Sequence, residues 1–94
     1  MTKSESEFQF KVRNLGCIAC LVAWQLYSPC EIHHILSGGR RIGEDRVLGL
    51  CPLHHRGGRA SEKFVSRHPY KRLFERCYGT ELELLKQTKM LIGV

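Results

Sequence analysis

The sequence predicts a small α+β domain: a β-hairpin with a long loop, a helix directly after it, and further helices toward the C-terminus. Two short runs rich in β-branched and aliphatic residues, 31–36 and 47–50, are separated by a polar loop with three glycines. Pro52 follows the second run and suits the first turn of a helix, which Gly57 would interrupt. Strand, strand, helix is therefore the predicted order.

The length of 94 residues predicts one domain over 1–94, because no repeat or linker divides the chain. A chain this short buries a modest fraction of its surface, so we expect a bound metal to supplement the core. At its start, Phe8, Phe10 and Val12 alternate with polar residues. This alternation favours a short edge strand, or a loosely held arm over residues 1–16.

The apolar run 21–27 is compatible with a helix or a buried strand, and Ser28-Pro29 should end it. Trp24 lies within this run and is expected in the core, as a lone aromatic among apolar residues usually is. Pro69 can open a later helix with an apolar face at i, i+3, i+4 and i+7. That face would consist of Tyr70, Leu73, Phe74 and Cys77, with Gly79 as the C-terminal cap.

The segment 80–83 reads as a capping box that begins a last helix. No stretch reaches the ~18 apolar residues of a membrane span, and the polar opening lacks the apolar region of a signal peptide. We therefore expect a soluble cytoplasmic protein with no membrane partner. In a reducing compartment, five cysteines, an odd number, are an unlikely disulfide framework, and metal ligation by thiolates is the better account.

Two metal-ligand pairs stand out, Cys17-x2-Cys20 and Cys51-x2-His54, with thirty residues between them. A two-residue gap lets the side chains of each pair converge on one ion, and three cysteines with one histidine form a normal structural zinc site. The spacing therefore predicts a structural Zn²⁺ that holds the fold together. Cys30 could replace Cys20 or His54 in this set, although a plain thiol is the simpler interpretation because it has no partner at that spacing.

The positive charge of the chain is concentrated in residues 40–76. This stretch holds ten of the fifteen Lys and Arg residues and four of the nine Asp and Glu residues, which accounts for the whole net charge of +6. A basic surface of this kind is typical of proteins that bind nucleic acid, and a solvated basic face is the alternative. The candidate phosphate contacts flank the proposed site: Arg40, Arg41, Arg56, Arg59, Lys63 and Arg67.

Two histidine pairs, at 33–34 and 54–55, leave imidazoles that a zinc site does not need. Adjacent side chains of a strand point to opposite faces, so His33 and His34 cannot do the same work. If His54 completes the zinc site, His55 can turn toward the hairpin. His68 lies in a polar segment before Pro69, and a surface or helix-capping role is expected for it.

These residues resemble a known family. The segment Glu31-Ile32-His33-His34-Ile35, followed by Leu50-Cys51-Pro52-Leu53-His54-His55, resembles the core of HNH (ββα-metal) endonucleases, in which a hairpin and a helix hold one divalent ion. The segment 74–81 with Leu84-Leu85 is similar to the end of phage recombination-enhancement (Ref-type) nucleases. The resemblance spans about residues 17–86 and includes the zinc-stapled variant of the core.

The resemblance implies a DNA endonuclease with His34 as general base and with His33 and His55 as ligands of a catalytic Mg²⁺ or Mn²⁺. Glu31 would orient the hairpin or a neighbouring basic side chain. It also implies a phage or bacterial protein, monomeric or weakly dimeric, with DNA and a recombinase filament as partners. An imidazole titrates near neutral pH and can take a proton from water, while the cation stabilises charge on phosphate.

The sequence departs from the HNH pattern at one position. The family's middle asparagine, about nine positions before the metal histidine, is replaced by Arg46, with Asp45 beside it. Either Asp45 holds this turn through a one-residue shift, or the contact is absent. The rival interpretation is a non-catalytic zinc finger that binds nucleic acid or acts as an adaptor. Such a finger has no use for His33, His34 and His55 together, so these histidines discriminate between the two functions.

Overall fold

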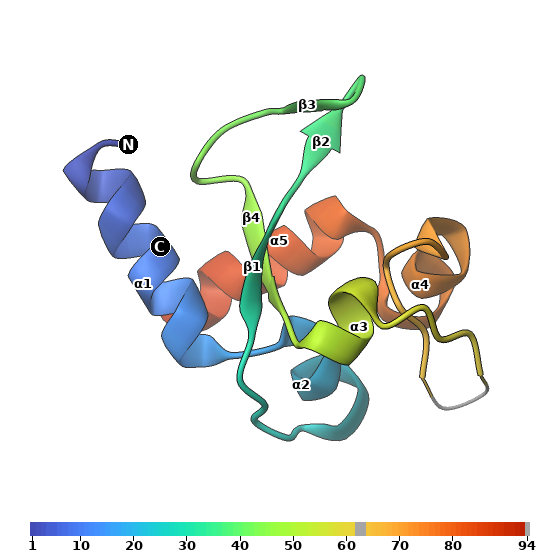
Figure 1. Cartoon of the computed structure of the whole chain (residues 1–94). Coiled ribbons are helices and arrows are strands. Elements are labelled where there is room, and N and C mark those ends of the chain that lie inside the picture. The colour runs from blue at the N-terminus through green and yellow to red at the C-terminus, as the bar shows by residue number, and fades with distance from the viewer. Residues whose placement is uncertain (62–63, 94) are drawn as a thin grey trace.

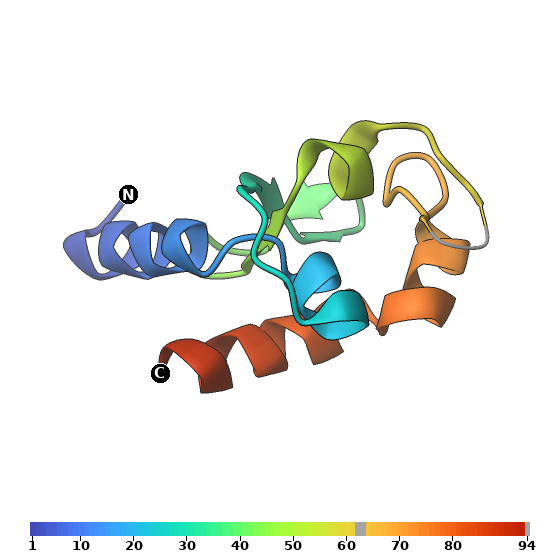
Figure 2. The ribbon, with the colours of Figure 1, turned by 90° about the horizontal axis from the view of Figure 1, so that it is seen from below.

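The computed structural model describes residues 1–61 and 64–93. Figure 1 shows a hairpin of β1 and β4 at the centre, with α1 on one side and α3 and α4 on the other. Figure 2 shows α5 along one face of the molecule and α3 toward the opposite face. The predicted α+β class, a hairpin followed by a helix and C-terminal helices, is confirmed. The elements are α1 (Lys3–Leu15), α2 (Ile18–Trp24), β1 (Glu31–His34), β2 (Leu36–Ser37), β3 (Arg40–Arg41), β4 (Val47–Leu50), α3 (Pro52–Arg56), α4 (Lys71–Tyr78) and α5 (Glu81–Ile92).

The central hairpin pairs β1 with β4 in antiparallel register, with Glu31 opposite Leu50 and His34 opposite Val47. All four residues of β4 are buried, whereas in its neighbour β1 only His33 is buried and the other three residues are partly exposed. Gly49 allows the chain to pass closely here, because a Cβ at this position would lie 2.6 Å from the carbonyl oxygen of Gly16 and 2.7 Å from Cys30 Sγ. The hairpin is therefore anchored against the segment that precedes it.

The long loop between the two strands forms an arm of its own. β2 and β3 pair through Leu36 with Arg41 and through Ser37 with Arg40. Gly38 and Gly39 connect them with φ of 60° and 79°, a conformation that glycine adopts without steric cost. Figure 1 shows this arm extending away from the helices. Arg40 and Arg41 are consequently exposed near its end.

The N-terminal segment is a helix, which corrects the expected edge strand or loosely held arm. Thr2 and Glu5 form a capping box at the start of α1. Phe8 and Val12, four residues apart, are buried on one face, whereas Phe10 is 63% exposed. The alternation was misleading because the first and last members of the set also have helical spacing.

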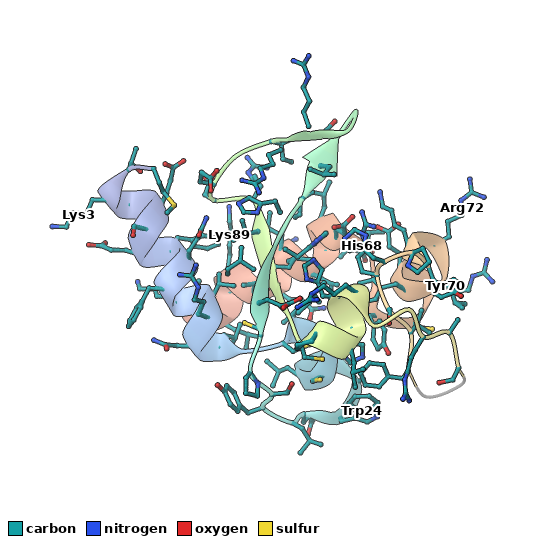
Figure 3. The ribbon with its side chains drawn as sticks, viewed as in Figure 1. Lys3, Trp24, His68, Tyr70, Arg72 and Lys89 are labelled. Carbon is teal, nitrogen blue, oxygen red and sulfur yellow. The ribbon has the colours of Figure 1, made fainter. Side chains whose placement is uncertain are left out.

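The apolar run after Cys20 also resolves as a helix. α2 has Cys17 as its N-cap and ends at Trp24, with Gln25 as a C-cap that has a left-handed φ of 55°. The helix therefore stops before Ser28, and Leu26 and Tyr27 are exposed. Trp24 is 42% exposed, which corrects the expected core position. Figure 3 labels Trp24 at the outer end of α2.

Two helices follow α3. α4 ends at Gly79 as expected, but the predicted apolar face is wrong for three of its four residues. Phe74 is buried together with Tyr78, one turn later, whereas Tyr70, Leu73 and Cys77 are exposed. The two buried residues of this short helix are four positions apart and therefore lie on one narrow face. The predicted capping box of α5 is present, with the Thr80 hydroxyl accepting from the Glu83 amide at 3.1 Å.

One hydrophobic core joins all the layers, and its members come from both ends of the chain. None of the helices among residues 1–61 and 64–93 combines the length and apolar character needed to cross a bilayer. The largest fully buried apolar side chains are those of Val12, Ile18, Val47, Leu48, Leu50, Val65, Phe74 and Leu84.

Candidate metal centres and active site

The first candidate metal centre consists of the four predicted ligands, Cys17, Cys20, Cys51 and His54, which converge in one buried cluster. The Nδ1 atom of His54 lies 3.4 Å from Cys17 Sγ, 3.4 Å from Cys20 Sγ and 3.3 Å from Cys51 Sγ. The sulfurs of Cys20 and Cys51 are 3.9 Å apart. Zinc bonds of about 2.3 Å to sulfur and about 2.0 Å to nitrogen give tetrahedral edges of this size. The donor set therefore fits a Zn²⁺ ion.

Local backbone structure explains this convergence. Cys17 and Cys20 lie at the start of α2, where the Cys17 sulfur also accepts from the Cys20 amide at 3.4 Å. Cys51 and His54 lie at the start of α3, where Pro52 occupies the first turn. Cys30 lies outside the cluster and points to the Val12 carbonyl at 3.8 Å. The alternative in which Cys30 replaces a ligand is therefore not the arrangement in the structure.

The surroundings of the cluster favour a bound cation. Burial lowers the pKa of His54 to about 4, so the ring is neutral and Nδ1 can offer a lone pair. Burial raises the pKa of the Cys17 and Cys20 thiols, which would therefore hold their protons without a positive charge between them. Phe64 stacks on His54 with the ring centroids 3.9 Å apart. The hydroxyl of Tyr78 lies 3.0 Å from His54 Nε2 and stabilises the orientation of the ring.

A second cluster brings together three imidazoles from three elements. His33 of β1, His55 of α3 and His68 of the loop before α4 can direct one nitrogen each to a common point. His33 Nδ1 and His55 Nε2 are 3.2 Å apart. The centroid of the His68 ring lies 5.5 Å from the centroid of the His33 ring and 5.2 Å from that of the His55 ring. Figure 3 labels His68 on the side where α3 and α4 lie. Sequence reasoning found His33 and His55 but not His68, because nothing in its local sequence indicates this contact.

Each of the two closest rings has a carboxylate on its other nitrogen. Glu81 contacts His33 Nε2, and Glu31 Oε1 lies 2.7 Å from His55 Nδ1. An ionised carboxylate only accepts hydrogen bonds, so these contacts assign the ring protons to His33 Nε2 and His55 Nδ1. The remaining lone pairs then face each other across 3.2 Å. Two facing acceptors repel unless a proton or a cation lies between them, so this pair is suited to a metal ion.

The charges around this cluster keep both carboxylates ionised. Hydrogen bonds from Arg56 and His55 lower the pKa of Glu31 to about 2. Burial alone raises the pKa of Glu81, but the hydrogen bond from His33 and the nearby charges of His33, Arg67 and Lys71 give a lowered pKa. Burial also lowers the pKa of His55, more than the contact with Glu31 raises it. A neutral His55 ring is the form that binds a metal.

His34 is not part of the three-histidine cluster. The strand turns its side chain to the face opposite that of His33, as alternation requires. Its Nε2 lies 3.1 Å from Glu44 Oε2, and the ring is 18% exposed. Hydrogen bonds from His34 and from Gln9 lower the pKa of Glu44. The structure thus separates the expected general base from the expected metal ligands.

A side chain of α1 binds the turn that precedes β4. Gln9 of α1 donates its side-chain amide to the Glu44 carbonyl at 2.8 Å and to Glu44 Oε2 at 3.1 Å. Asp45 is exposed and lies 3.9 Å from Arg46, whose backbone amide donates to the Gly43 carbonyl at 3.2 Å. Of the two alternatives for this position, a turn held by the Asp45 side chain is therefore not what the structure has. The side-chain amide of Gln9 binds the neighbouring residue, Glu44.

The six basic residues expected at DNA differ in their surroundings. Arg40, Arg41 and Arg59 are exposed. Arg56 donates to Glu31 at 2.7 Å and 3.0 Å, and Arg67 is nine-tenths buried beside Glu81 and His68. Lys63 lies outside the described residues. Three of the five described arginines are thus exposed, with Arg41 Nη1 3.9 Å from Glu44 Oε1, and the other two border the histidine cluster.

A family model for recombination enhancement, RecA-dependent nuclease, matches residues 1–92. No curated protein matches closely enough to add a relative. The match covers nearly the whole chain, including both clusters, and its description assigns a nuclease role in recombination. The chain belongs to the family of recombination enhancement, RecA-dependent nucleases.

Proposed function

We propose that this protein is an HNH-type endonuclease that hydrolyses DNA phosphodiester bonds with one divalent metal ion, separate from its structural zinc. The observation that carries the proposal is the pair of imidazole nitrogens of His33 and His55, 3.2 Å apart, each with a carboxylate on its far side. A purely structural zinc finger has no need for a second, carboxylate-backed histidine set. Nuclease chemistry does need one.

His33 and His55 would hold the catalytic ion, with His68 as a third ligand at the exposed side of the cluster. Imidazole ligands suit Mn²⁺ and other transition-series dications, and Mg²⁺ is accepted by open sites that retain water. When bound, the ion would stabilise negative charge on the phosphate and the leaving oxygen. The protein groups orient the rings and leave one side of the site open for substrate.

The charges bordering the site suit a phosphodiester. Two carboxylates, Glu31 and Glu81, face three cationic side chains, Arg56, Arg67 and Lys71. A dication raises the excess of positive charge further, and an anionic substrate would compensate it. The exposed Arg40 and Arg41 on the β2–β3 arm would contact the backbone of the duplex.

His34 is the proposed general base. A water molecule attacks phosphorus while His34 takes its proton, the bond to the 3′ oxygen breaks, and this oxygen gains a proton. The products are a 5′-phosphate and a 3′-hydroxyl. Because Glu44 occupies Nε2 of His34, Nδ1 is the nitrogen left for this proton. His34 faces away from the metal ligands, so the scissile phosphate must lie over the edge of β1.

Plasmid nicking by purified protein tests the proposal, with Mg²⁺, Mn²⁺ or chelator and with elemental analysis for zinc. His34→Ala should keep bound zinc and the folded state but lower the nicking rate by about 10² to 10⁴-fold, the usual contribution of a general base. Cys51→Ala should unfold the chain. Retained nicking in His34→Ala would remove His34 as base.

The alternative function, a non-catalytic zinc-finger or adaptor module, makes the opposite prediction. Duplex DNA would bind, yet no metal would support nicking, and His33→Ala would behave as the wild type. A recombinase filament as partner, a cytoplasmic location and a monomeric or weakly dimeric state belong to the same proposal. Nicking measured with and without such a filament tests the partner directly.

A further inference from the structure

The first residue of α5 contributes to the histidine cluster from the far end of the chain. Glu81 is only 4% exposed, and its carboxylate meets His33 of β1 on one oxygen. The other oxygen lies 3.3 Å from Arg67 Nε and 3.7 Å from Lys71 Nζ. We infer that Glu81 is a positioning residue for the catalytic metal: it turns the Nδ1 lone pair of His33 into the site. The inference rests on the proposed function.

Glu81 makes a hydrogen bond to His33, whereas its contact with Arg67 is an ion pair without hydrogen-bond geometry. Arg67 Nε is buried and has no hydrogen-bond partner among the described residues, although it lies within ion-pair distance of Glu81. The well-directed contact of the carboxylate is therefore the one to His33 Nε2. The positive charges of Arg67 and Lys71 stabilise the ionised Glu81 carboxylate. The hydrogen bond between this carboxylate and His33 Nε2 then orients the His33 ring.

The sequence around Glu81 explains how a carboxylate can be held at this depth. Thr80 and Glu83 form the capping box that begins α5, and Glu81 occupies the first helical position. Its amide donates to Glu75 Oε2 at 3.1 Å. A negative side chain in the first turn is also favoured by the helix dipole. The C-terminal helix thus presents a fixed acceptor to a ring located 48 positions earlier in the sequence.

Orientation by a second partner normally strengthens metal binding. Carboxylates behind metal-binding histidines fix the tautomer and raise ligand basicity, and their loss lowers metal affinity by about 10 to 100-fold. A merely structural ion pair would change the stability of the protein but not its affinity for the ion. Metal affinity in the folded state therefore separates the two roles.

The experiment uses the full-length, zinc-loaded protein and Mn²⁺ as the probe, with free Mn²⁺ measured by electron paramagnetic resonance. Glu81→Gln should weaken Mn²⁺ binding by about 10 to 100-fold while bound zinc stays constant. Glu83→Gln is the matched control, because it also removes a carboxylate from the first turn of α5. Glu83 does not contact His33, and glutamine still serves in a capping box, so this variant should bind Mn²⁺ as the wild type does.

Glu81→Asp is a second variant, needed in case Glu81→Gln fails to fold. It retains a negative charge that can pair with Arg67 and Lys71. Its shorter side chain withdraws from His33, so Mn²⁺ binding should again weaken while circular dichroism stays native. In a His33→Ala background, Glu81→Gln should cause no further loss, since the two residues act through one ring. Unchanged Mn²⁺ affinity in both Glu81 variants would overturn the inference. If His33→Ala alone leaves Mn²⁺ binding unchanged, the proposed metal site itself is wrong, so the two failures are distinguishable.

Discussion

The hydroxyl of Tyr78 provides a test of how the proposed zinc centre is supported. This oxygen lies 3.0 Å from His54 Nε2 and 3.3 Å from the backbone nitrogen of Val65. With Nδ1 directed at the three sulfurs, Nε2 carries the ring proton, so the hydroxyl oxygen accepts from both groups. Burial raises the pKa of Tyr78, so the side chain stays neutral and both contacts are ordinary hydrogen bonds.

Tyr78→Phe keeps the packing of the ring and removes only this acceptor. Each buried donor left without a partner costs about 1–3 kcal/mol, and the longer Val65 contact belongs at the low end. We therefore expect the free energy of unfolding to fall by about 2–4 kcal/mol. For a domain of this size this corresponds to roughly 10–30 °C in Tm. The affinity for zinc should fall by about 10 to 100-fold, because the His54 ring loses its orienting partner.

Urea denaturation in a buffer that fixes the free zinc concentration measures the effect, since metal binding contributes to stability by mass action. Tyr27→Phe is the control, because it removes a hydroxyl from a residue that is 66% exposed and should leave stability unchanged. If Tyr78→Phe lowers the free energy of unfolding by less than about 0.5 kcal/mol, the reasoning is refuted, because a substitution on the protein surface has an effect of that size.

Two further predictions concern DNA and zinc. Replacing Arg40 and Arg41 together by alanine should weaken generic duplex binding and lower the slope of log K against log salt by about 2, because each phosphate contact contributes about 0.9. Fluorescence anisotropy over a salt series measures the slope, and an unchanged slope would place the DNA elsewhere. Zinc binding should release a proton from each of Cys17 and Cys20, because burial raises their pKa and zinc requires thiolates. Zinc affinity should thus fall as pH falls, and calorimetry in buffers of different ionisation enthalpy should detect the protons; a heat independent of buffer would contradict this.

Each half of the proposed zinc centre was predictable because its geometry is local. Each ligand pair spans a single turn at the start of a helix, so spacing alone brings Cys17 to Cys20 and Cys51 to His54. The hairpin and α3 were predictable for a similar reason. β-branched runs favour strands, glycines favour the loop between them, and Pro52 favours the start of a helix, and each of these preferences depends only on neighbouring residues. The α1 helix could have been found as well, because the Thr2 capping box is visible in the sequence.

The sequence by itself determined the four members of the cysteine–histidine cluster, the order of strand, strand and helix, and the opposite orientations of His33 and His34. Only the tertiary structure decided which side chains join His33 and His55, because Glu81 and His68 reach them from distant segments. It also decided that Cys77 and Trp24 are exposed and that Gln9 ties the turn before β4. Local patterns describe which face of an element is apolar or polar. They carry no information about which distant segment packs against that face, since this depends on the burial of the whole core.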